Sequence, residues 1–328
     1  MQPYEQLEQE FGSWAGVKNV VACSSGTAAL HLALEALQLP QGSAVLIPDF
    51  TMIACPRAAT LAGFKPIFVD CGDDLLIDVE SIEKALHLAY GLKIRAIMPV
   101  HIYGRRCNME RIARIAEAYG LYVIEDLAEA HGVPPHPASH AACWSFFSNK
   151  IIHGEEGGAV SFLEPWCEPL ARELRCLGFT KKHDFMHTPR GHNYRLANLL
   201  ATPIIDSLHE VKANTKARRI VEEWYNEFVP EEWHMPKRDA VWVYDLRIVG
   251  MRYPMQDYVV NYLNMQGIQA RHGFKPCSKQ PEYRDDTESS KASLLSQEVI
   301  YLPVYPHMSN LEVRRIVETL EEVVQRFR

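Results

Sequence analysis

The first half of the chain alternates short, uninterrupted apolar runs with segments of helical periodicity. The runs that predict strands cover residues 20–22, 44–47, 66–70, 94–100 and 121–124, and the helices predicted between them cover 27–37, 53–62, 79–88 and 109–119. A strand that is apolar on both sides has to be buried on both faces, and crossover helices provide that cover. The alternation therefore predicts an α/β protein with a mostly parallel sheet, whose ligand site lies at the carboxyl ends of the strands.

The second half of the chain predicts a smaller α+β unit that follows a long helix. The long helix is expected over residues 203–228, followed by strands at 241–248 and 268–271 and helices at 255–266 and 311–327. We therefore divide the chain into a large domain, residues 1–205, and a second part, residues 206–328, which holds the linking helix and a small C-terminal domain. The polar stretch 285–291 predicts a surface loop.

Composition and charge exclude several classes of protein. Apolar residues make up 47% and charged residues 23% of the chain, which is typical of a folded globular protein. The net charge of -7 comes without a basic stripe, so nucleic acid is not an expected partner. No apolar stretch approaches the roughly 20 residues of a membrane span, and the first residues do not resemble a secretory signal. The eight cysteines form no CxxC pair and are expected to be reduced thiols of a cytoplasmic protein.

Lys150 is the most unusual candidate for chemistry. It follows the aromatic stretch 144–147 and precedes two isoleucines and then three glycines between residues 154 and 158. Lysine is rarely buried unless it is paired or reactive, and burial lowers the pKa of an amine that has to form an imine. The alternative interpretation is an exposed loop lysine whose stem lies along apolar surface.

Two other segments end predicted strands with residues that suit a cofactor. Residues 24–27 (Ser-Ser-Gly-Thr) open a helix, and the free N–H groups and dipole of a helix N-terminus favour a phosphate. An ordinary helix cap is the alternative. Asp126 follows the strand 121–124, where a carboxylate can pair with the cationic ring nitrogen of pyridoxal phosphate (PLP). A helix cap or a solvent-facing turn acid is the alternative there.

Two further kinds of site find little support. His131, His136 and His140 lack an acid or a cysteine that would complete a ligand set, so no metal is expected. No GxGxxG motif follows the first predicted strand, which argues against a nicotinamide-dependent oxidoreductase.

Together, these segments resemble the DegT/DnrJ/EryC1/StrS family of nucleotide-sugar aminotransferases, which have fold type I of the PLP-dependent transferases. The resemblance covers nearly the whole chain and is carried jointly by the stretches 25–34, 48–54, 61–70, 99–104, 124–132, 144–158 and 191–195, with weaker matches at 269–271 and 302–306. It implies a large domain with a mostly parallel seven-stranded sheet, a smaller C-terminal α+β domain, and PLP as the cofactor.

The resemblance implies roles for four residues around the cofactor ring. Lys150 matches the catalytic lysine that binds PLP as a Schiff base and moves a proton between Cα of the amino donor and C4′ of the cofactor. Asp126 matches the acid that pairs with the pyridinium nitrogen, and Glu129 matches the Gln or Glu beside the ring and its 3-oxygen. Met52 stands where many members carry an aromatic ring that stacks on the pyridine, and methionine can supply a polarizable face there.

The resemblance also implies a phosphate site and a dimer. Gly26, Thr27 and Ser145 match the residues that hold the phosphate. Asn193 matches a residue that reaches the phosphate from the other subunit, so an obligate homodimer with shared active sites is expected. By comparison with the family, we expect the chain to lack most of the usual N-terminal segment before residues 11–16, a segment that helps to close the site and the dimer.

The stretches 50–52, 184–187 and 191–195 look most like those of GDP-perosamine synthases. This resemblance implies transfer of an amino group from L-glutamate to C4 of a nucleotide-linked 4-keto-6-deoxy sugar. Lys150 argues against the family's 3-dehydratase branch, in which a histidine replaces the lysine. The alternatives are an aminotransferase for another keto-sugar or a keto-cyclitol, and a catalytically silent paralogue with a binding or regulatory role.

Overall fold

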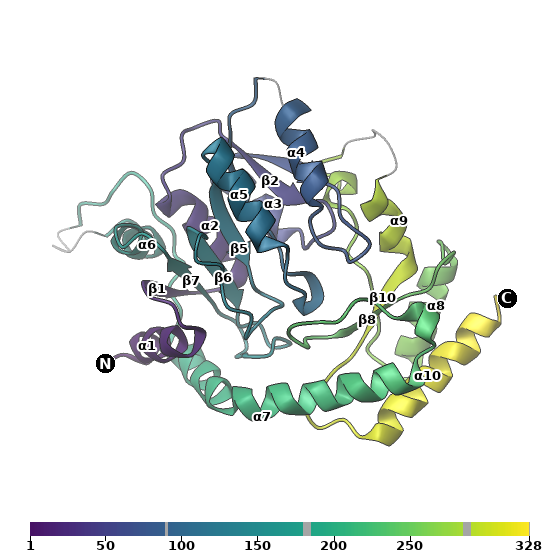
Figure 1. Ribbon diagram of the computed structural model, residues 1–328. Coiled ribbons are helices and arrows are strands. Elements are labelled where there is room, and N and C mark those ends of the chain that lie inside the picture. The colour runs from purple at the N-terminus through teal and green to yellow at the C-terminus, as the bar shows by residue number, and fades with distance from the viewer. Residues whose placement is uncertain (89–90, 180–184, 285–289, 328) are drawn as a thin grey trace.

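A seven-stranded sheet forms the centre of the computed structural model, which describes residues 1–88, 91–179, 185–284 and 290–327 (Figure 1). The strands lie in the order β1-β7-β6-β5-β4-β2-β3. Their bounds are β1 (Val20–Cys23), β2 (Ala44–Pro48), β3 (Lys65–Val69), β4 (Ile94–Ile97), β5 (Tyr122–Asp126), β6 (Ala141–Ser145) and β7 (Gly158–Phe162). Strand β7 is antiparallel to both β1 and β6, and the other neighbours are parallel. The predicted α/β fold with a mostly parallel seven-stranded sheet is confirmed.

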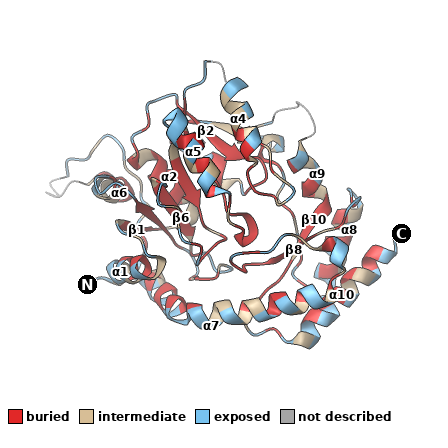
Figure 2. Ribbon diagram, viewed as in Figure 1, coloured by how far each residue is buried: buried red, intermediate tan, exposed pale blue. Residues whose placement is uncertain are grey.

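Helices cover both faces of this sheet. Their bounds are α1 (Pro3–Ala15), α2 (Gly26–Ala36), α3 (Ala54–Leu61), α4 (Val79–Leu88), α5 (Met109–Tyr119) and α6 (Cys167–Arg175). Figure 1 shows α5 in front of the sheet and α2 behind it. Every residue of β1, β2 and β7 is buried, whereas α4 and α5 keep one exposed face (Figure 2). This is the burial that continuous apolar strands require.

Helix α1 was not predicted, and a buried carboxylate attaches it to the sheet. Glu8 accepts a hydrogen bond from the backbone N–H of Ala22 in β1 (2.8 Å). Its carboxylate also pairs with Arg172 (2.9 Å) and Arg175 (3.0 Å) of α6. Arg172 and Arg175 lie more than 160 residues further along the chain, so the local sequence pattern around Glu8 does not predict these ion pairs.

Helix α7 (Asn198–Phe228) links the two parts of the molecule. It begins five residues before the predicted start, so Pro203 lies inside it. Ile204 and Leu208 belong to the hydrophobic core of the large sheet, whereas Val221 and Tyr225 belong to a second core. The predicted boundary at residues 205 and 206 falls within this continuous helix, and we keep the division into two domains as a proposal.

The C-terminal part has a three-stranded antiparallel sheet in the order β8-β10-β9. Its strands are β8 (Tyr244–Arg247), β9 (Arg271–His272) and β10 (Val299–Leu302), and its helices are α8 (Met255–Met265), α9 (Lys291–Glu298) and α10 (Asn310–Gln325). Short 3₁₀ turns are η1 (Ile102–Gly104), η2 (Glu231–Trp233) and η3 (Cys277–Lys279). The described residues contain no helix that combines the length and apolarity needed to cross a bilayer.

The predicted bounds of both strands and of the polar loop in this part were wrong, and the strand predicted over 268–271 is the two-residue β9. The strand predicted over 241–248 begins only at Tyr244, because Trp242 and Val243 pack into the core of the large sheet instead of pairing with β10. The loop predicted over 285–291 ends earlier than expected: Ser290 caps α9 by accepting from the N–H of Ser293, and Lys291 is its first residue. Residues 285–289 lie outside the described residues, as does Asp184 of the stretch 184–187.

Candidate active site

Lys150 lies in the connection between β6 and β7, with its amine inside the protein. The side chain is 11% exposed, and Nζ is 3.9 Å from Oε1 of Glu129. On another side, Nζ lies 3.7 Å from the ring centroid of Trp242. Burial lowers the pKa of Lys150 from its ordinary value, although Glu129 and Asp126 act in the opposite direction. The interpretation as an exposed loop lysine is therefore wrong.

Asp126 is the last residue of β5 and is also buried. The strand extends two residues beyond its predicted end because Asp126 pairs with Cys143 of β6. Its Oδ1 accepts a hydrogen bond from the N–H of Ala128 (2.9 Å), and its Oδ2 accepts one from the thiol of Cys55 (3.2 Å). Burial raises the pKa of Cys55 well above its ordinary value, so the sulfur keeps the proton that it donates.

Glu129 lies between Lys150 and the turn η1. Its Oε2 accepts a hydrogen bond from the backbone N–H of Tyr103 (2.8 Å). Burial raises the pKa of Glu129 to about 7, against the lowering effect of the Lys150 ammonium. This carboxyl group can therefore take up or release a proton near neutral pH, 3.9 Å from the amine of Lys150.

Gly26, Thr27 and Ser145 belong to the region where the N-terminus of α2 packs against the end of β6. A Cβ atom on Gly26 would lie 2.7 Å from Cβ of Ser145, so only glycine fits there without a shift of one element. In the first turn of α2, the Ser25 hydroxyl accepts from the N–H of Ala28 (3.1 Å). The amides of Gly26 and Thr27 precede that pair, at the positive end of the helix dipole, where they can bind an anion.

Met52 and Asn193 are exposed, unlike the other predicted residues. Met52 follows β2, and its side chain is 50% exposed. Asn193 is exposed, and Arg195 donates a hydrogen bond to its side chain (3.3 Å). It lines a cavity of about 620 Å³ together with Tyr4 and Arg175. The six residues that lie in the interior or at the first turn of α2 are Gly26, Thr27, Asp126, Glu129, Ser145 and Lys150.

The structure adds Trp242 and Cys55 to the predicted residues. Trp242 is 5% exposed, and its indole N–H donates to the backbone oxygen of Asn149 (2.8 Å), the residue before Lys150. The two partners of this hydrogen bond, Asn149 and Trp242, are 93 residues apart in the sequence. No local motif in the sequence connects either residue with the site, and only the folded chain brings them there.

The three histidines that we considered as metal ligands serve separate hydrogen bonds. Each accepts from a different backbone N–H: His131 from Ile152 (3.0 Å), His136 from Ala138 (3.2 Å) and His140 from Val123 (3.1 Å). Among the described residues, a different trio brings its ligand atoms within 4.8 Å of one another, namely His31, Glu35 and His192. There His192 and Glu35 already form a hydrogen bond of 2.6 Å.

Comparisons with known proteins place this arrangement in a family. The model of the DegT/DnrJ/EryC1/StrS aminotransferase family matches residues 2–321. The chain belongs to this family. It is 30% identical to the GDP-perosamine synthase of Caulobacter vibrioides, over 97% of this chain and 89% of that protein. It is also 30% identical to a UDP-N-acetyl-3-dehydro-alpha-D-glucosamine 3-aminotransferase of Acidithiobacillus ferrooxidans, over 97% of this chain and 88% of that protein. A solved DegT DnrJ EryC1 StrS aminotransferase from Brucella abortus shares the fold at 25% identity with a TM-score of 0.87, over 98% of this chain and 90% of that chain.

The protein is thus a PLP-dependent aminotransferase of a family that includes sugar aminotransferases. The residues at the site fit this cofactor. Because Gly26 has no Cβ, the first turn of α2 packs closely against Ser145, and the amides of that turn favour a phosphate; Lys150 supplies a buried amine. Asp126 and Glu129 supply two buried carboxyl groups in different environments.

Replacement of Gly26 by alanine tests the phosphate site. The added Cβ would lie 2.7 Å from Cβ of Ser145, so either α2 or β6 has to move. Overpacking of this kind costs about 1–3 kcal/mol, and we expect Gly26→Ala to weaken PLP binding by roughly 5- to 150-fold. Fluorescence titration with PLP measures the effect. An affinity within twofold of the native value would contradict a phosphate site at this helix N-terminus.

Proposed function

We propose that the aminotransferase moves an amino group from L-glutamate to C4 of a nucleotide-linked 4-keto-6-deoxy sugar, in perosamine-type amino-sugar synthesis. The observation that carries the chemistry is the buried amine of Lys150, 3.9 Å from Glu129 and in the electrostatic reach of Asp126. The sugar class rests on the similarity to the GDP-perosamine synthase of Caulobacter vibrioides, which extends over 97% of this chain.

Lys150 would hold the cofactor covalently and then move a proton between Cα of the amino donor and C4′. When bound, PLP supplies the electron sink that makes this proton transfer feasible. Because its pKa is lowered, more of this buried amine is neutral at a given pH, and the neutral form is the one that attacks a carbonyl carbon and accepts a proton. Glu129 can share the proton, because its own pKa of about 7 lies close to neutral pH.

The other residues would fix the orientation of the cofactor. Asp126 would pair with the ring nitrogen, and its two hydrogen bonds, from Ala128 and Cys55, hold the carboxylate in place for that pairing. Glu129 would lie beside the 3-oxygen. Met52 would offer its thioether to the ring face.

The phosphate would be held by residues from two subunits. Gly26, Thr27 and Ser145 would bind it from one subunit, and Asn193 would reach it from the other. The exposed position of Asn193, beside a cavity of about 620 Å³, supports this shared site in a homodimer, because an exposed side chain can meet a second chain. Sedimentation of the purified protein tests the dimer.

A second candidate is amination at C3 of a UDP-linked keto-sugar. The UDP-N-acetyl-3-dehydro-alpha-D-glucosamine 3-aminotransferase of Acidithiobacillus ferrooxidans is as similar to this chain as the GDP-perosamine synthase, at 30% identity and 97% coverage. The chemistry at Lys150 would be the same, and only the nucleotide and the position of the carbonyl carbon would differ.

Turnover with a panel of keto-sugars decides between the two candidates. We expect the kcat/KM for a GDP-linked 4-keto-6-deoxyhexose, with L-glutamate as donor, to exceed that for the UDP-linked 3-keto-sugar by at least about tenfold, which corresponds to about 1.4 kcal/mol. The mass of the aminated sugar and the release of 2-oxoglutarate are the readouts. Preference for the UDP-linked sugar would favour the second candidate. A protein that binds PLP but aminates no keto-sugar would favour a silent paralogue.

A further inference from the structure

Trp242 is the aromatic side chain that lies against the amine of Lys150. Its ring centroid is 3.7 Å from Nζ, well within the range of a cation–π contact. The carboxylate of Glu129 lies 3.9 Å from the same nitrogen. The amine is thus close to both an aromatic face and an acid, and both of these partners are at least nine-tenths buried.

The indole of Trp242 is held by contacts on several sides. Its N–H donates to the backbone oxygen of Asn149 (2.8 Å), and its own backbone oxygen accepts from the guanidinium of Arg218 (3.0 Å). Its ring stacks on Tyr103, with an angle of 29° between the planes. Since the N–H of Tyr103 donates to Glu129, one packed group positions both partners of the Lys150 amine.

The segment before Trp242 is bound to the turn η1. The N–H groups of Asp239 and Ala240 both donate to the backbone oxygen of Gly104, at 3.0 and 2.9 Å. A Cβ atom on Gly104 would lie 1.8 Å from the backbone oxygen of Ala240, so this approach requires a glycine. The carboxylate of Asp239 also accepts from the N–H of Arg106 (2.9 Å).

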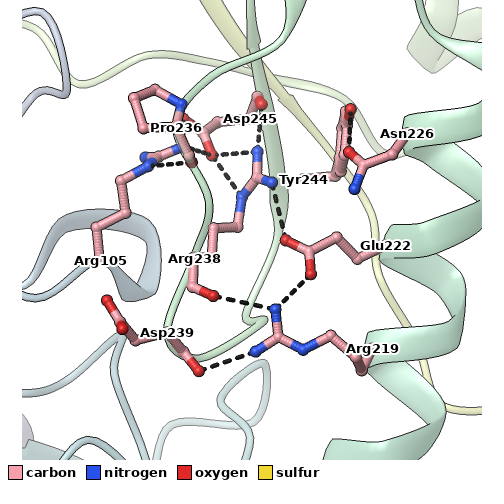
Figure 3. Close-up of polar contacts among 9 residues, drawn as sticks. All are labelled: Arg105, Arg219, Glu222, Asn226, Pro236, Arg238, Asp239, Tyr244 and Asp245. Carbon is pink, nitrogen blue, oxygen red and sulfur yellow. Dashed lines mark hydrogen bonds and ion pairs between the residues drawn. The ribbon is translucent and has the colours of Figure 1, made fainter.

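A buried network of charges fixes the same segment to β8 and α7 (Figure 3). Arg105 contacts both carboxylate oxygens of Asp245, at 2.9 and 2.8 Å. Arg238 donates to Asp245 (2.8 Å) and to Glu222 of α7 (3.1 Å). Arg219 closes the network by donating to the backbone oxygen of Arg238 (3.0 Å). The position of Trp242 is therefore set by large-domain, helical and C-terminal elements together.

We propose that Trp242 is a positioning residue that holds the free amine of Lys150 beside Glu129 whenever the lysine is not bonded to the cofactor. The inference rests on the proposed role of Lys150. In that part of the cycle the flexible lysine stem has to keep Nζ within reach of the carbon atoms between which the proton moves. A cation–π contact attracts the ammonium without a fixed direction, so it restrains the amine and still lets it return.

The proposal predicts the direction in which the pKa of Lys150 shifts when the indole is removed. Asp126, Glu129 and His131 interact electrostatically with Lys150. An aromatic face stabilises the ammonium form, so its removal alone lowers the pKa of Lys150. A ring that served only to exclude water would have the opposite effect, because admitted water raises the pKa of a buried lysine. The two roles therefore predict shifts in opposite directions.

The test uses the full-length protein loaded with pyridoxamine phosphate, which leaves the Lys150 amine free. The rate at which acetic anhydride acetylates Lys150, followed by peptide mass spectrometry across pH, gives the pKa from its midpoint and the accessibility from its plateau. We expect Trp242→Leu to lower the midpoint by about one pH unit, equivalent to a tenfold change in the equilibrium. Trp242→Phe, which keeps a weaker ring face, should lower it less. Trp166→Leu, at a tryptophan that is 47% exposed, is the control and should leave the midpoint unchanged.

An unchanged or raised midpoint in Trp242→Leu would overturn the proposal. If the leucine variant does not fold, the phenylalanine variant decides, and a midpoint equal to or above the native one would count against the proposal. The role of Lys150 itself fails by a separate result, namely a Lys150→Ala protein that still shows the absorbance band of lysine-bound PLP. The titration of Lys150 keeps its meaning in that case, because it does not depend on catalysis.

Discussion

Replacement of Lys150 by alanine is expected to lower kcat for transamination by at least about a thousandfold. The variant loses both the covalent attachment of PLP and the amine that moves the proton, and positioned proton transfer alone contributes about 10²–10⁴-fold. The absorbance band of the lysine-bound cofactor should also disappear. PLP should still bind, because Asp126, Ser145 and the N-terminus of α2 remain in place. Stopped-flow absorbance with L-glutamate measures the rate, and a PLP titration measures the binding.

Lys212→Ala is the matched control for this variant. Lys212 lies on the exposed face of α7, so its removal changes the number of lysines without reaching the site. Added methylamine should restore part of the activity of Lys150→Ala and should leave the activity of the control unchanged, since a small amine can occupy the space that Lys150 leaves. Turnover of Lys150→Ala above about a tenth of the native rate would show that another group carries the proton.

Much of the large domain could be predicted from the sequence because several of its strands are continuous apolar runs buried on both faces, whereas β6 and β7 were not predicted from the pattern. Burial on both faces explains the continuous apolar runs at β1 and β2. The amphipathic patterns of α4 and α5 predicted the first and last residues of both helices correctly. The strand β9 is only two residues long and is defined by pairing with β10, so the apolar pattern before it predicted a strand that begins three residues too early. Pairing between distant segments is invisible to local periodicity.

Some residues of the candidate site could likewise be predicted from the sequence, and others could not. Asp126 and the segment opening α2 follow predicted strands, so their placement could be inferred from the order of the elements. Lys150 follows β6, which the apolar pattern did not predict, so it was identified from its own neighbours and from the family resemblance. Trp242 and Cys55 could not be inferred, because each reaches the site through a contact with a residue far along the chain. The sequence also did not show that Lys150 is buried, since that depends on Trp242 and Glu129 closing over it.

The second large effect is expected for Asp245→Ala, which should lower the free energy of unfolding by about 3–5 kcal/mol, the usual result of breaking a buried ion pair. Asp245 is fully buried, and without it Arg105 loses its carboxylate partner while remaining buried. Burial alone would raise the pKa of Asp245, but Arg105 and Arg238 together hold it below the ordinary value of 3.8. The stabilisation by this carboxylate is therefore present above pH 3.8 and is lost as the pH falls through the lower pKa of the folded state.

Urea unfolding of the PLP-loaded protein at neutral pH measures this loss, with Glu80→Gln as the control. Glu80 forms an ion pair of 2.6 Å with Arg111, but both side chains are largely exposed, and the control should unfold like the native protein. An Asp245→Ala protein as stable as the control would show that water or Glu222 replaces the lost carboxylate.

Because the same network fixes the segment that carries Trp242, the folded fraction of Asp245→Ala should also show the lowered Lys150 midpoint that is expected for Trp242→Leu. A native Lys150 midpoint in a destabilised Asp245→Ala protein would mean that the network stabilises the fold without positioning the indole of Trp242.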